Sequence, residues 1–495
     1  MAESGTTSLL SSPELLLPDW DPTAPRRAQL EAGLRESIRS GRLRPGVRLP
    51  SSRALGAELG VSRRLVVEAY EQLAAEGYLV SSQGSGTRVA RATMEASSGA
   101  SAPEGGLVEA VAGVAPLAPG AIDLFPGAPD LSLFPRRAWG RAQRRALAEL
   151  PDARLGYGEF SGTAELRDAL AEHLGRVRAA AVVPGQVVVT AGYQQGLRIF
   201  CHLLKGRGAR RVAIEDPGYP VAAWTIESEG LELVPVRVDE DGLDVEALAA
   251  ADPEAVIVTP AHSLPAGAVL AAERRLALVE WARGRGALVL EDDYDAELRY
   301  DRQSVGSLQG LAPDRVLALG SLSKTLAPGL RLGWLLVPPA LLGSVVREKL
   351  LTSRGAPALD QLALATLMQS GRYDRHVRRM SEVYRQRRDA LVGAVAEHAP
   401  RLRLLGLEAG CHAVLELPAG VTEDEIVQSA LSHAVRVYGL SRYRVDAPRA
   451  AETHVPPALV LGFGNLDEER IRRGVEALGA AITQALAGLA GQGDQ

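Results

Sequence analysis

The chain has 495 residues, of which 46% are hydrophobic and 23% charged, and its net charge at pH 7 is −5. This composition is typical of globular proteins and excludes a disordered chain, and the length predicts two or three domains. No apolar run is long enough to span a membrane, so we expect no membrane segment. The two cysteines, Cys201 and Cys411, cannot form a disulfide framework and are expected to be packing residues in a reducing cytoplasm. No Cys/His spacing predicts a metal site.

Charge is distributed unevenly along the chain. Residues 25–90 contain eleven arginines and six glutamates, so this segment carries +5 and the remainder of the chain carries −10. A small basic module attached to a larger acidic one indicates that DNA contact is confined to the first module.

The basic segment is predicted to contain three short helices followed by a β-hairpin. We expect the helices over 27–40, 53–59 and 63–76, and the strands over 78–81 and 87–90. Leu30, Leu34 and Ile38 recur every four residues, as on one buried helix face, and Ser62 is placed to cap the third helix. This order is typical of a winged helix-turn-helix, whose third helix enters the major groove with its N-terminus first. A tri-helical protein-interaction domain is the alternative.

Two motifs of this segment resemble the GntR-type DNA-binding domain over its full length, namely the sequence from Ser40 to Arg53 and the sequence from Glu71 to Leu79. The resemblance assigns 20–90 to this domain. It implies DNA contacts from Arg48, Arg53, Ser62, Arg63, Arg64 and the wing turn at Gly84. The family often has an arginine where this chain has Val67, so part of the usual groove contact is absent or supplied by Arg64. Residues 91–120 are rich in Ala, Ser, Gly and Pro and are predicted to form a flexible linker.

From Ile122 onward, short apolar runs alternate with helical segments. Strands are expected over 187–190, 211–214, 233–236, 255–259, 287–290 and 316–319. Continuous apolar runs separated by helices are typical of a mainly parallel sheet that is buried on both faces. Such sheets bind ligands at the carboxyl ends of their strands, and the main polar motifs of this module follow strand ends.

One lysine stands in a turn of small residues after the last of these strands. From Gly320 to Trp334 the sequence reads Gly-Ser-Leu-Ser-Lys-Thr-Leu-Ala-Pro-Gly-Leu-Arg-Leu-Gly-Trp. Only three of the 55 basic residues are lysines: Lys205, Lys324 and Lys349. Lysine can form an imine with an aldehyde once its amine is deprotonated, whereas arginine cannot. Taken alone, this turn would be interpreted as carrying a surface lysine.

Three further motifs follow strand ends. The sequence from Ala191 to Gly196 is a glycine-flanked turn that opens a helix, where free N–H groups and the helix dipole suit a phosphate. Tyr219 lies in a Pro/Gly turn, where its ring could stack on a planar group. The acids between Glu291 and Asp295 are costly to bury unless they are paired, for example with a protonated pyridine.

Taken together, this order of motifs resembles the fold-type I aminotransferases, which bind pyridoxal phosphate. With the N-terminal domain in front, the chain resembles the MocR/GabR regulators, a subgroup of the GntR family. Further matching segments are Phe125 to Asp130, Leu155 to Gly162 and Tyr373 to Met380. The resemblance covers nearly the whole chain. It implies an α/β aminotransferase-like domain over 121–495, with a mostly parallel sheet in an α/β/α arrangement and a smaller C-terminal α/β subdomain from about 345.

The resemblance also implies roles for individual residues around the cofactor. Lys324 would form the internal aldimine, and Asp292 would face the pyridine nitrogen and keep it protonated. Tyr294 would hydrogen-bond the phenolic oxygen and Tyr219 would stack on the ring. The phosphate would be held by Ser321, Ser323 and Arg331 and by the backbone of Gly192 and Tyr193.

Tyr157 corresponds to a tyrosine that reaches the phosphate of the other subunit, which implies a homodimer, either domain-swapped or head-to-tail. His262 belongs to the cofactor-binding loop 259–267, in which Ser263 replaces the usual glutamine. Arg442 would bind a carboxylate of the effector, with Arg444 close enough to compete.

The hypothesis that follows is a transcriptional regulator that binds an operator in double-stranded DNA and depends on pyridoxal 5'-phosphate. It would sense an amino compound, or pyridoxal phosphate itself, through the aldimine at Lys324. One alternative is a catalytically active aminotransferase with an accessory DNA-binding domain. Another is a DNA-binding protein whose aminotransferase-like domain is an empty dimerisation scaffold.

Overall fold

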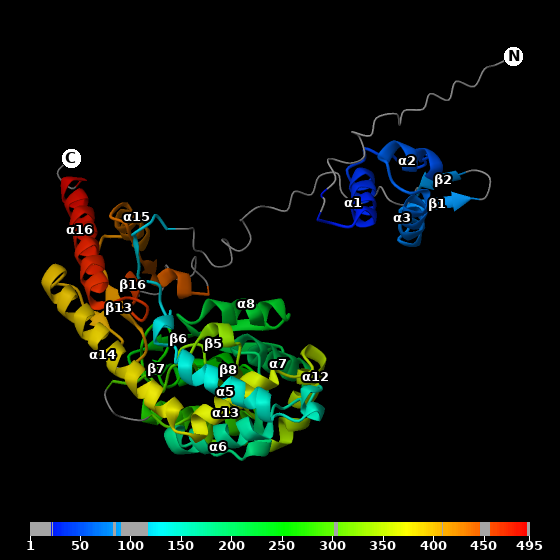
Figure 1. Cartoon of the computed structure of the whole chain (residues 1–495). Helices are drawn as coiled ribbons and strands as arrows, with labels where there is room; N and C mark the ends of the chain where they lie inside the picture. Colours follow the sequence, from blue (N-terminus) through cyan, green and yellow to red (C-terminus); the bar gives the residue numbers. More distant parts are fainter. Residues whose placement is uncertain are drawn as a thin grey trace. The chain divides into compact units, whose positions relative to one another are not determined.

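The computed structural model describes residues 21, 23–82, 86–90, 117–300, 305–407, 409–445 and 456–492. The chain divides into two compact units, Met1–Pro116 and Leu117–Gln495 (Figure 1). The wing turn at Gly84 and most of the predicted linker, residues 91–116, lie outside the described residues. Among the helices that the structure describes, none combines the length and the apolar character needed to cross a membrane.

The first unit consists of three helices and an antiparallel hairpin, which confirms the winged helix-turn-helix prediction. Its elements are α1 (Arg26–Arg39), α2 (Ser52–Leu59), α3 (Arg63–Ala75), β1 (Leu79–Ser82) and β2 (Gly86–Val89). Leu30, Leu34 and Ile38 are buried in its core, as their spacing predicted. The Ser62 side chain accepts a hydrogen bond from the Leu65 N–H (3.2 Å) and caps α3.

The second unit is built on an eight-stranded sheet in the order β4-β11-β10-β9-β8-β5-β6-β7. Its strands are β4 (Val187–Thr190), β5 (Arg211–Asp216), β6 (Glu232–Asp239), β7 (Gly242–Leu243), β8 (Ala255–Val258), β9 (Leu288–Asp293), β10 (Val316–Ser321) and β11 (Gly333–Leu336). The pairs from β10 through β9, β8 and β5 to β6 are parallel, whereas β11 is antiparallel to both of its neighbours. The predicted mainly parallel sheet is confirmed, and the sequence pattern missed β11.

Helices cover both faces of this sheet. They are α5 (Arg136–Glu149), α6 (Ala164–Arg178), α7 (Tyr193–Gly206), α8 (Pro220–Ser228), α9 (Val245–Ala251), α10 (Ala272–Arg285), α11 (Leu308–Leu311), α12 (Leu342–Thr352) and α13 (Ala358–Gln369). One face packs against α7, α8 and α12, and the other against α9, α10 and α11. Because successive side chains of a strand point to opposite faces, the apolar runs that predicted the strands supply both cores. Burial of that apolar surface is the main favourable term for this arrangement.

A smaller sheet in the order β12-β13-β16-β15 forms a second layer with the C-terminal helices. Its elements are β12 (Leu404–Leu405), β13 (His412–Glu416), β15 (Tyr438–Gly439), β16 (Ala458–Gly462), α14 (Arg372–His398), α15 (Glu423–Ser432) and α16 (Glu468–Gln492). α14 and α16 lie side by side (Figure 1). β3 (Ile122–Asp123) pairs with β14 (Val435–Arg436), so the start of the second unit joins its C-terminal part. Short 3-10 helices cover Leu131–Leu133, Asp152–Leu155, Pro184–Gln186, Pro328–Leu330, Pro339–Leu341 and Leu440–Tyr443.

Candidate cofactor site

The loops that carry the predicted site residues follow neighbouring strands of the large sheet. β10 and β9 pair in parallel with Leu319 opposite Asp292, and β10 ends at Ser321, three residues before Lys324. β8 and β5, whose loops carry His262 and Tyr219, come next in the sheet. Since parallel strands end at one edge, the sheet brings these loops to the same side.

The Lys324 amine is held by a backbone carbonyl. Its Nζ donates a hydrogen bond to the carbonyl oxygen of Gly127. Gly127 has a φ of +78°, and a Cβ at this position would lie 3.0 Å from Nζ. The glycine is therefore needed both for its backbone conformation and for the approach of the lysine. Gly127 lies in a segment that supported the family resemblance, but its contact with Lys324 was not predicted.

Thr325, the residue after Lys324, is fixed by the long helix α14. The Tyr373 hydroxyl lies 3.0 Å from Thr325 Oγ1, and His376 Nε2 donates to the Thr325 carbonyl oxygen at 2.7 Å. Tyr373 also donates to Glu297 Oε1 (3.1 Å). All of Thr325, Tyr373 and His376 are buried, so the lysine turn is anchored to the smaller subdomain. The sequence pattern did not predict these contacts.

Arg331 faces the turn after β4. Its Nη2 donates a hydrogen bond to the Ala191 carbonyl oxygen (2.8 Å). Gly192 has a φ of +84°, and a Cβ there would lie 3.3 Å from the guanidinium of Arg331. The first N–H groups of α7 point toward this turn, as in any helix, and Gly192 has no side chain to cap them. A helix N-terminus facing an arginine is a suitable site for a phosphate.

Asp292 carries a buried carboxylate oxygen without a partner. Its Oδ1 makes no hydrogen bond among the described residues. Burial raises the pKa of this carboxyl well above its usual value, and the nearby acids Asp293 and Asp295 raise it further; the Tyr193 hydroxyl, which makes no hydrogen bond among the described residues, acts in the opposite direction. An unpaired buried carboxylate is costly, so the site has room for a cationic N–H donor that would satisfy it.

The Tyr219 ring, which is expected to stack on the cofactor, lies beside the ring of Tyr193. Tyr219 is exposed at the end of its loop and contacts Tyr193 edge-to-face, with ring centroids 5.7 Å apart. Ser321 and Ser323 lie on the lysine turn itself, where the Ser323 N–H donates to Ser321 Oγ (3.4 Å).

Two histidines lie beside Tyr294. His262 Nδ1 lies 2.9 Å from Asp295 Oδ2 and 3.2 Å from the Tyr294 hydroxyl. Its ring centroid is 4.9 Å from that of His412, which is buried with neither ring nitrogen hydrogen-bonded within the described residues. Burial lowers the pKa of His412 well below its usual value, and the charges of His262 and Lys324 lower it further. His412 is therefore a neutral imidazole. The sequence showed only that it adjoins Cys411.

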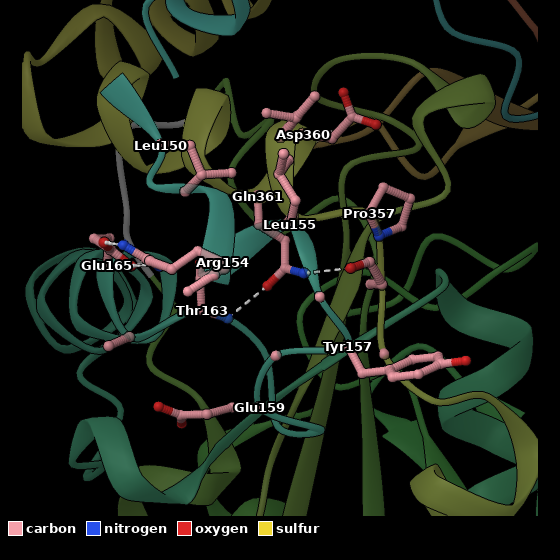
Figure 2. A pocket seen from close by; sticks show the side chains of 18 of the residues that line it. Leu150, Arg154, Leu155, Tyr157, Glu159, Thr163, Glu165, Pro357, Asp360 and Gln361 are labelled. Atoms are coloured by element: carbon pink, nitrogen blue, oxygen red, sulfur yellow. Dashed lines mark hydrogen bonds and ion pairs between the residues drawn. The ribbon is translucent and has the colours of Figure 1, made fainter. Parts of the chain in front are cut away.

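Tyr157 lies at a cavity that Lys324 does not line. It is 74% exposed and lines this cavity of about 960 Å³ together with Thr163, Pro357 and Gln361 (Figure 2). The Gln361 side chain accepts a hydrogen bond from the Thr163 N–H (2.8 Å) and holds one wall of the cavity.

Arg442 is exposed, and its guanidinium carbon lies 5.3 Å from the centre of the Tyr438 ring. The carbonyl oxygen of the next residue, Tyr443, accepts a hydrogen bond from the Gly218 N–H (2.8 Å). The segment that carries Arg442 is thereby fixed to the loop that carries Tyr219.

The predicted DNA-contacting side chains of the first unit lie around the start of α3 and the hairpin. Arg53, Ser62, Arg63 and Arg64 are exposed. Arg64 Nε pairs with Glu68 (2.8 Å), an exposed pair that is weak enough to exchange for a phosphate. Arg48 forms an antiparallel bridge with Arg88 of β2, beside the wing strand.

Comparisons with known proteins match both units. Residues 122–478 match the aminotransferase class I and II family, and residues 26–89 match the gntR family of bacterial regulatory proteins. The HTH-type pyridoxine biosynthesis transcriptional regulator PdxR of Corynebacterium glutamicum is 34% identical over 449 residues, which cover 90% of this chain and 93% of that protein. The probable rhizopine catabolism regulatory protein MocR of Rhizobium meliloti is 32% identical over 481 residues, covering 94% and 96%. The chain belongs to the MocR-type regulators of the GntR family.

The second unit of this MocR-type regulator has the fold of pyridoxal phosphate-dependent aminotransferases. The α-aminoadipate aminotransferase LysN of Thermus thermophilus, solved with N-(5'-phosphopyridoxyl)-L-leucine, superimposes with a TM-score of 0.66 at 28% identity. The match covers 75% of this chain and 94% of that chain. Pyridoxal phosphate is the cofactor that this family and fold imply.

Three features of the regulator fit that cofactor. The unpartnered Asp292 oxygen suits a protonated ring nitrogen, and the Lys324 amine stands on a turn that follows the neighbouring strand. Arg331 and the N-terminus of α7 face each other across Gly192, where an added Cβ would approach the guanidinium. The residues present therefore suit an aldehyde, a pyridine ring and a phosphate.

Proposed function

We propose that this MocR-type regulator binds pyridoxal phosphate at Lys324 and uses it to sense an amino compound or the cofactor itself. Occupation of the site would change the affinity of the GntR unit for its operator in double-stranded DNA. Such a regulator acts in the cytoplasm, where its DNA lies. The observation that carries the proposal is the buried, unpartnered Asp292 oxygen beside the strand that leads to Lys324.

Each site residue has a task that follows from its chemistry. When bound, pyridoxal phosphate supplies an aldehyde that captures primary amines and a ring that withdraws electrons. Asp292 would place negative charge opposite the ring nitrogen and keep it protonated. Arg331, with Ser321, Ser323 and the first N–H groups of α7, would hold the phosphate. Gly127 orients the Lys324 amine through its carbonyl oxygen.

The remaining predicted contacts concern the ring and the effector. Tyr219 would stack on the ring and Tyr294 would bond its phenolic oxygen, with His262 fixing the Tyr294 hydroxyl (3.2 Å). Arg442 would bind a carboxylate of the effector. An effector shifts DNA affinity only by the difference in its own affinity for the two states of the protein, and a coupling of about 1–3 kcal/mol corresponds to roughly 5–150-fold.

We also propose that the working form is a homodimer, domain-swapped or head-to-tail. Tyr157 is 74% exposed and lines a cavity of about 960 Å³ whose lining does not include the lysine of its own chain. In a second copy its hydroxyl would complete the phosphate site of the partner. Large exposed aromatic side chains at the mouth of a cavity are typical of protein–protein contacts.

Lys324→Ala in the full chain tests the sensing function, with Lys205→Ala as a matched control. The Lys205 side chain is 47% exposed and lies on α7, away from the turn. Borohydride reduction of the wild-type protein with pyridoxal phosphate, followed by peptide mass analysis, should place the cofactor on Lys324 out of only three lysines. Fluorescence anisotropy with labelled DNA from upstream of the gene then measures affinity with and without cofactor and candidate amines.

We expect Lys324→Ala to bind DNA but to lose the response to cofactor and amines, because the amine that holds the aldehyde is gone. Lys205→Ala should respond like the wild type. A full ligand response in Lys324→Ala, or reduction products on Lys205 or Lys349 alone, would contradict the proposal. Sustained turnover of an amino donor and a 2-oxo acid would instead identify a working aminotransferase.

A further inference from the structure

Helix α5 presents a row of arginines on the outside of the second unit. Arg137, Arg141 and Arg144 are exposed, whereas Trp139 and Ala142 on the opposite side of the helix are buried. At about 100° per residue, the three arginines fall within roughly 60° of one another around the helix axis. We call Arg137, Arg141 and Arg144 the arginine row. In Figure 1, α5 is the cyan helix in front of the large sheet.

The arginine row is unfavourable for the helix itself. Like charges spaced three or four residues apart destabilise a helix by about 0.2–0.5 kcal/mol per pair. Arg136 and Arg137 also stand in the first turn, which contains no acid, against the positive end of the helix dipole. Within the described part of the chain, no ion-pair partner accompanies any member of the row. Arg145, beside the row, pairs with Glu149 (2.9 Å).

Two helices of the first unit balance exposed arginines with glutamates one turn away, and the first turn of α14, which also carries exposed arginines, contains the acid Asp374. Arg27 pairs with Glu31 and Arg64 pairs with Glu68, each at 2.8 Å. The row also cannot be a by-product of composition, because the chain outside residues 25–90 carries a net charge of −10. The arginine row concentrates positive charge on an otherwise acidic part of the chain, and its charges destabilise the helix that carries them. Such a row indicates an anionic partner.

We propose that the arginine row binds the phosphate backbone of duplex DNA. The aminotransferase-like unit would thus make a sequence-independent contact in addition to the contacts of the GntR unit. Seven residues of helix span about 10 Å. A duplex presents roughly six phosphates over that length, at one charge per about 1.7 Å. Arginine is suited to them, because its planar guanidinium can donate two parallel hydrogen bonds to a pair of phosphate oxygens.

DNA is favoured over other anionic partners because this chain already carries a DNA-binding unit. Once that unit is bound, flanking duplex is present at high effective concentration, so three ordinary phosphate contacts are enough. This step depends on the proposed function, namely that the GntR unit binds DNA. An acidic protein surface or a second copy of the chain is the competing occupant, and the experiment separates them.

The experiment measures how DNA affinity depends on salt in the full chain. The test variant is Arg137→Gln/Arg141→Gln/Arg144→Gln, since glutamine keeps the helix propensity and removes the charge. The matched control is Arg372→Gln/Arg375→Gln/Arg379→Gln, which removes the same charge from exposed positions of α14. The probe is a duplex of arbitrary sequence and about 60 base pairs, because backbone binding is independent of sequence. Thermal unfolding and sedimentation confirm that each variant is folded.

Loss of three phosphate contacts should reduce the slope of log affinity against log salt by about 2.7, at 0.9 per contact. Over a fourfold rise in salt the wild type would then lose about 40-fold more affinity than the test variant. The control should keep the wild-type slope, and cofactor binding should be unchanged in both variants. Equal slopes for test variant and wild type, or the same reduction in the control, would overturn the proposal.

The two proposals fail in distinguishable ways. A wild-type protein that binds DNA and responds to ligand, but whose salt slope equals that of the test variant, overturns only the arginine row contact. A test variant that sediments as a smaller species shows that the row joins copies of the chain, and this also overturns it. A wild-type protein without measurable DNA affinity overturns the proposed function and the row contact together.

Discussion

Replacing Asp292 by asparagine tests the cofactor site through the stability of the cofactor-free protein. Asp292 is buried, its Oδ1 has no partner among the described residues, and burial raises the pKa of its carboxyl well above the usual value. Because the folded protein keeps a proton that the unfolded chain releases above pH 3.8, each pH unit in that window costs the wild type about 1.4 kcal/mol of stability. Asparagine has nearly the same shape and also leaves an oxygen without a partner, but it needs no proton. We therefore expect Asp292→Asn to raise the free energy of unfolding at pH 7 by about 1–3 kcal/mol.

The raised pKa of Asp292 determines how the stability difference between variant and wild type changes with pH. Because the folded-state pKa of Asp292 is raised, the folded protein keeps a proton that the unfolded chain releases above pH 3.8. The contribution of this carboxyl to stability is therefore present at low pH and lost as the pH rises toward the folded pKa. Asparagine does not titrate, so the stability difference between variant and wild type should grow from about pH 4 upward.

The assay is denaturant unfolding between pH 4 and 8, repeated with saturating pyridoxal phosphate. A ligand at 100 times its Kd stabilises by about 2.7 kcal/mol, and the variant should gain less because it lacks the charge opposite the ring nitrogen. Asp314→Asn is the control, since that exposed carboxylate forms only surface ion pairs, with Arg283 (3.3 Å) and Arg315 (3.6 Å), and should change stability by no more than about 0.5 kcal/mol. A less stable cofactor-free Asp292→Asn, or an undiminished gain on adding cofactor, would refute the reasoning.

Three further experiments test other parts of the site and the surrounding fold. Gly192→Ala is compared with Gly208→Ala as its control. Both glycines have a positive φ (+84° and +82°), so each substitution should destabilise the protein by about 1–2 kcal/mol. Only the Cβ at Gly192 would approach a guanidinium (3.3 Å), so only Gly192→Ala should weaken cofactor binding in a titration, and equal affinities would contradict the phosphate site. Burial lowers the pKa of His173, but the hydrogen bond and charge of Glu297 outweigh burial, so the net pKa is raised. Wild-type stability should therefore fall as the pH rises above about 6.5, whereas His173→Gln should lack this fall. The same stability difference between wild type and variant at pH 6 and at pH 8 would contradict this prediction. Tyr157→Phe should change the free energy of unfolding by less than about 0.5 kcal/mol, because the side chain is 74% exposed, yet weaken cofactor binding once two chains associate; unchanged binding would remove Tyr157 from the site.

The sequence predicted the large sheet well because each buried strand is a continuous apolar run. β4 was predicted with its observed bounds, Val187–Thr190, and β5, β8, β9 and β10 within a few residues. β11 was missed because Gly333–Leu336 directly follows the lysine turn and reads as its end. The two-residue strands β3, β7, β12, β14 and β15 were missed because two residues show no periodicity, and β13 and β16 of the smaller sheet were not predicted either.

The sequence also indicated which loops meet, because strand ends of a parallel sheet share one edge. It could not indicate which side chains contact each other across long separations. The hydrogen bonds from α14 to Thr325 join residues 48 and 51 positions apart. The carbonyl that holds Lys324 comes from Gly127, 197 positions earlier. Such pairs leave no local pattern, and the roles of the site residues toward the cofactor stay predictions.

The contacts of Thr325 connect the lysine turn to the smaller subdomain. Thr325 makes two hydrogen bonds with α14, one through its hydroxyl and one through its carbonyl oxygen. The Tyr373 hydroxyl is also hydrogen-bonded to Glu297. α14 runs to His398 and packs along α16, so it reaches across the smaller subdomain. Because close-packed interiors transmit displacements rather than absorb them, a shift of the turn must move α14 or break buried hydrogen bonds. Breaking them costs about 1–3 kcal/mol for each group left without a partner, which is the same order as a typical coupling energy between two sites. A displacement of the lysine turn would therefore be transmitted to α14 through these hydrogen bonds.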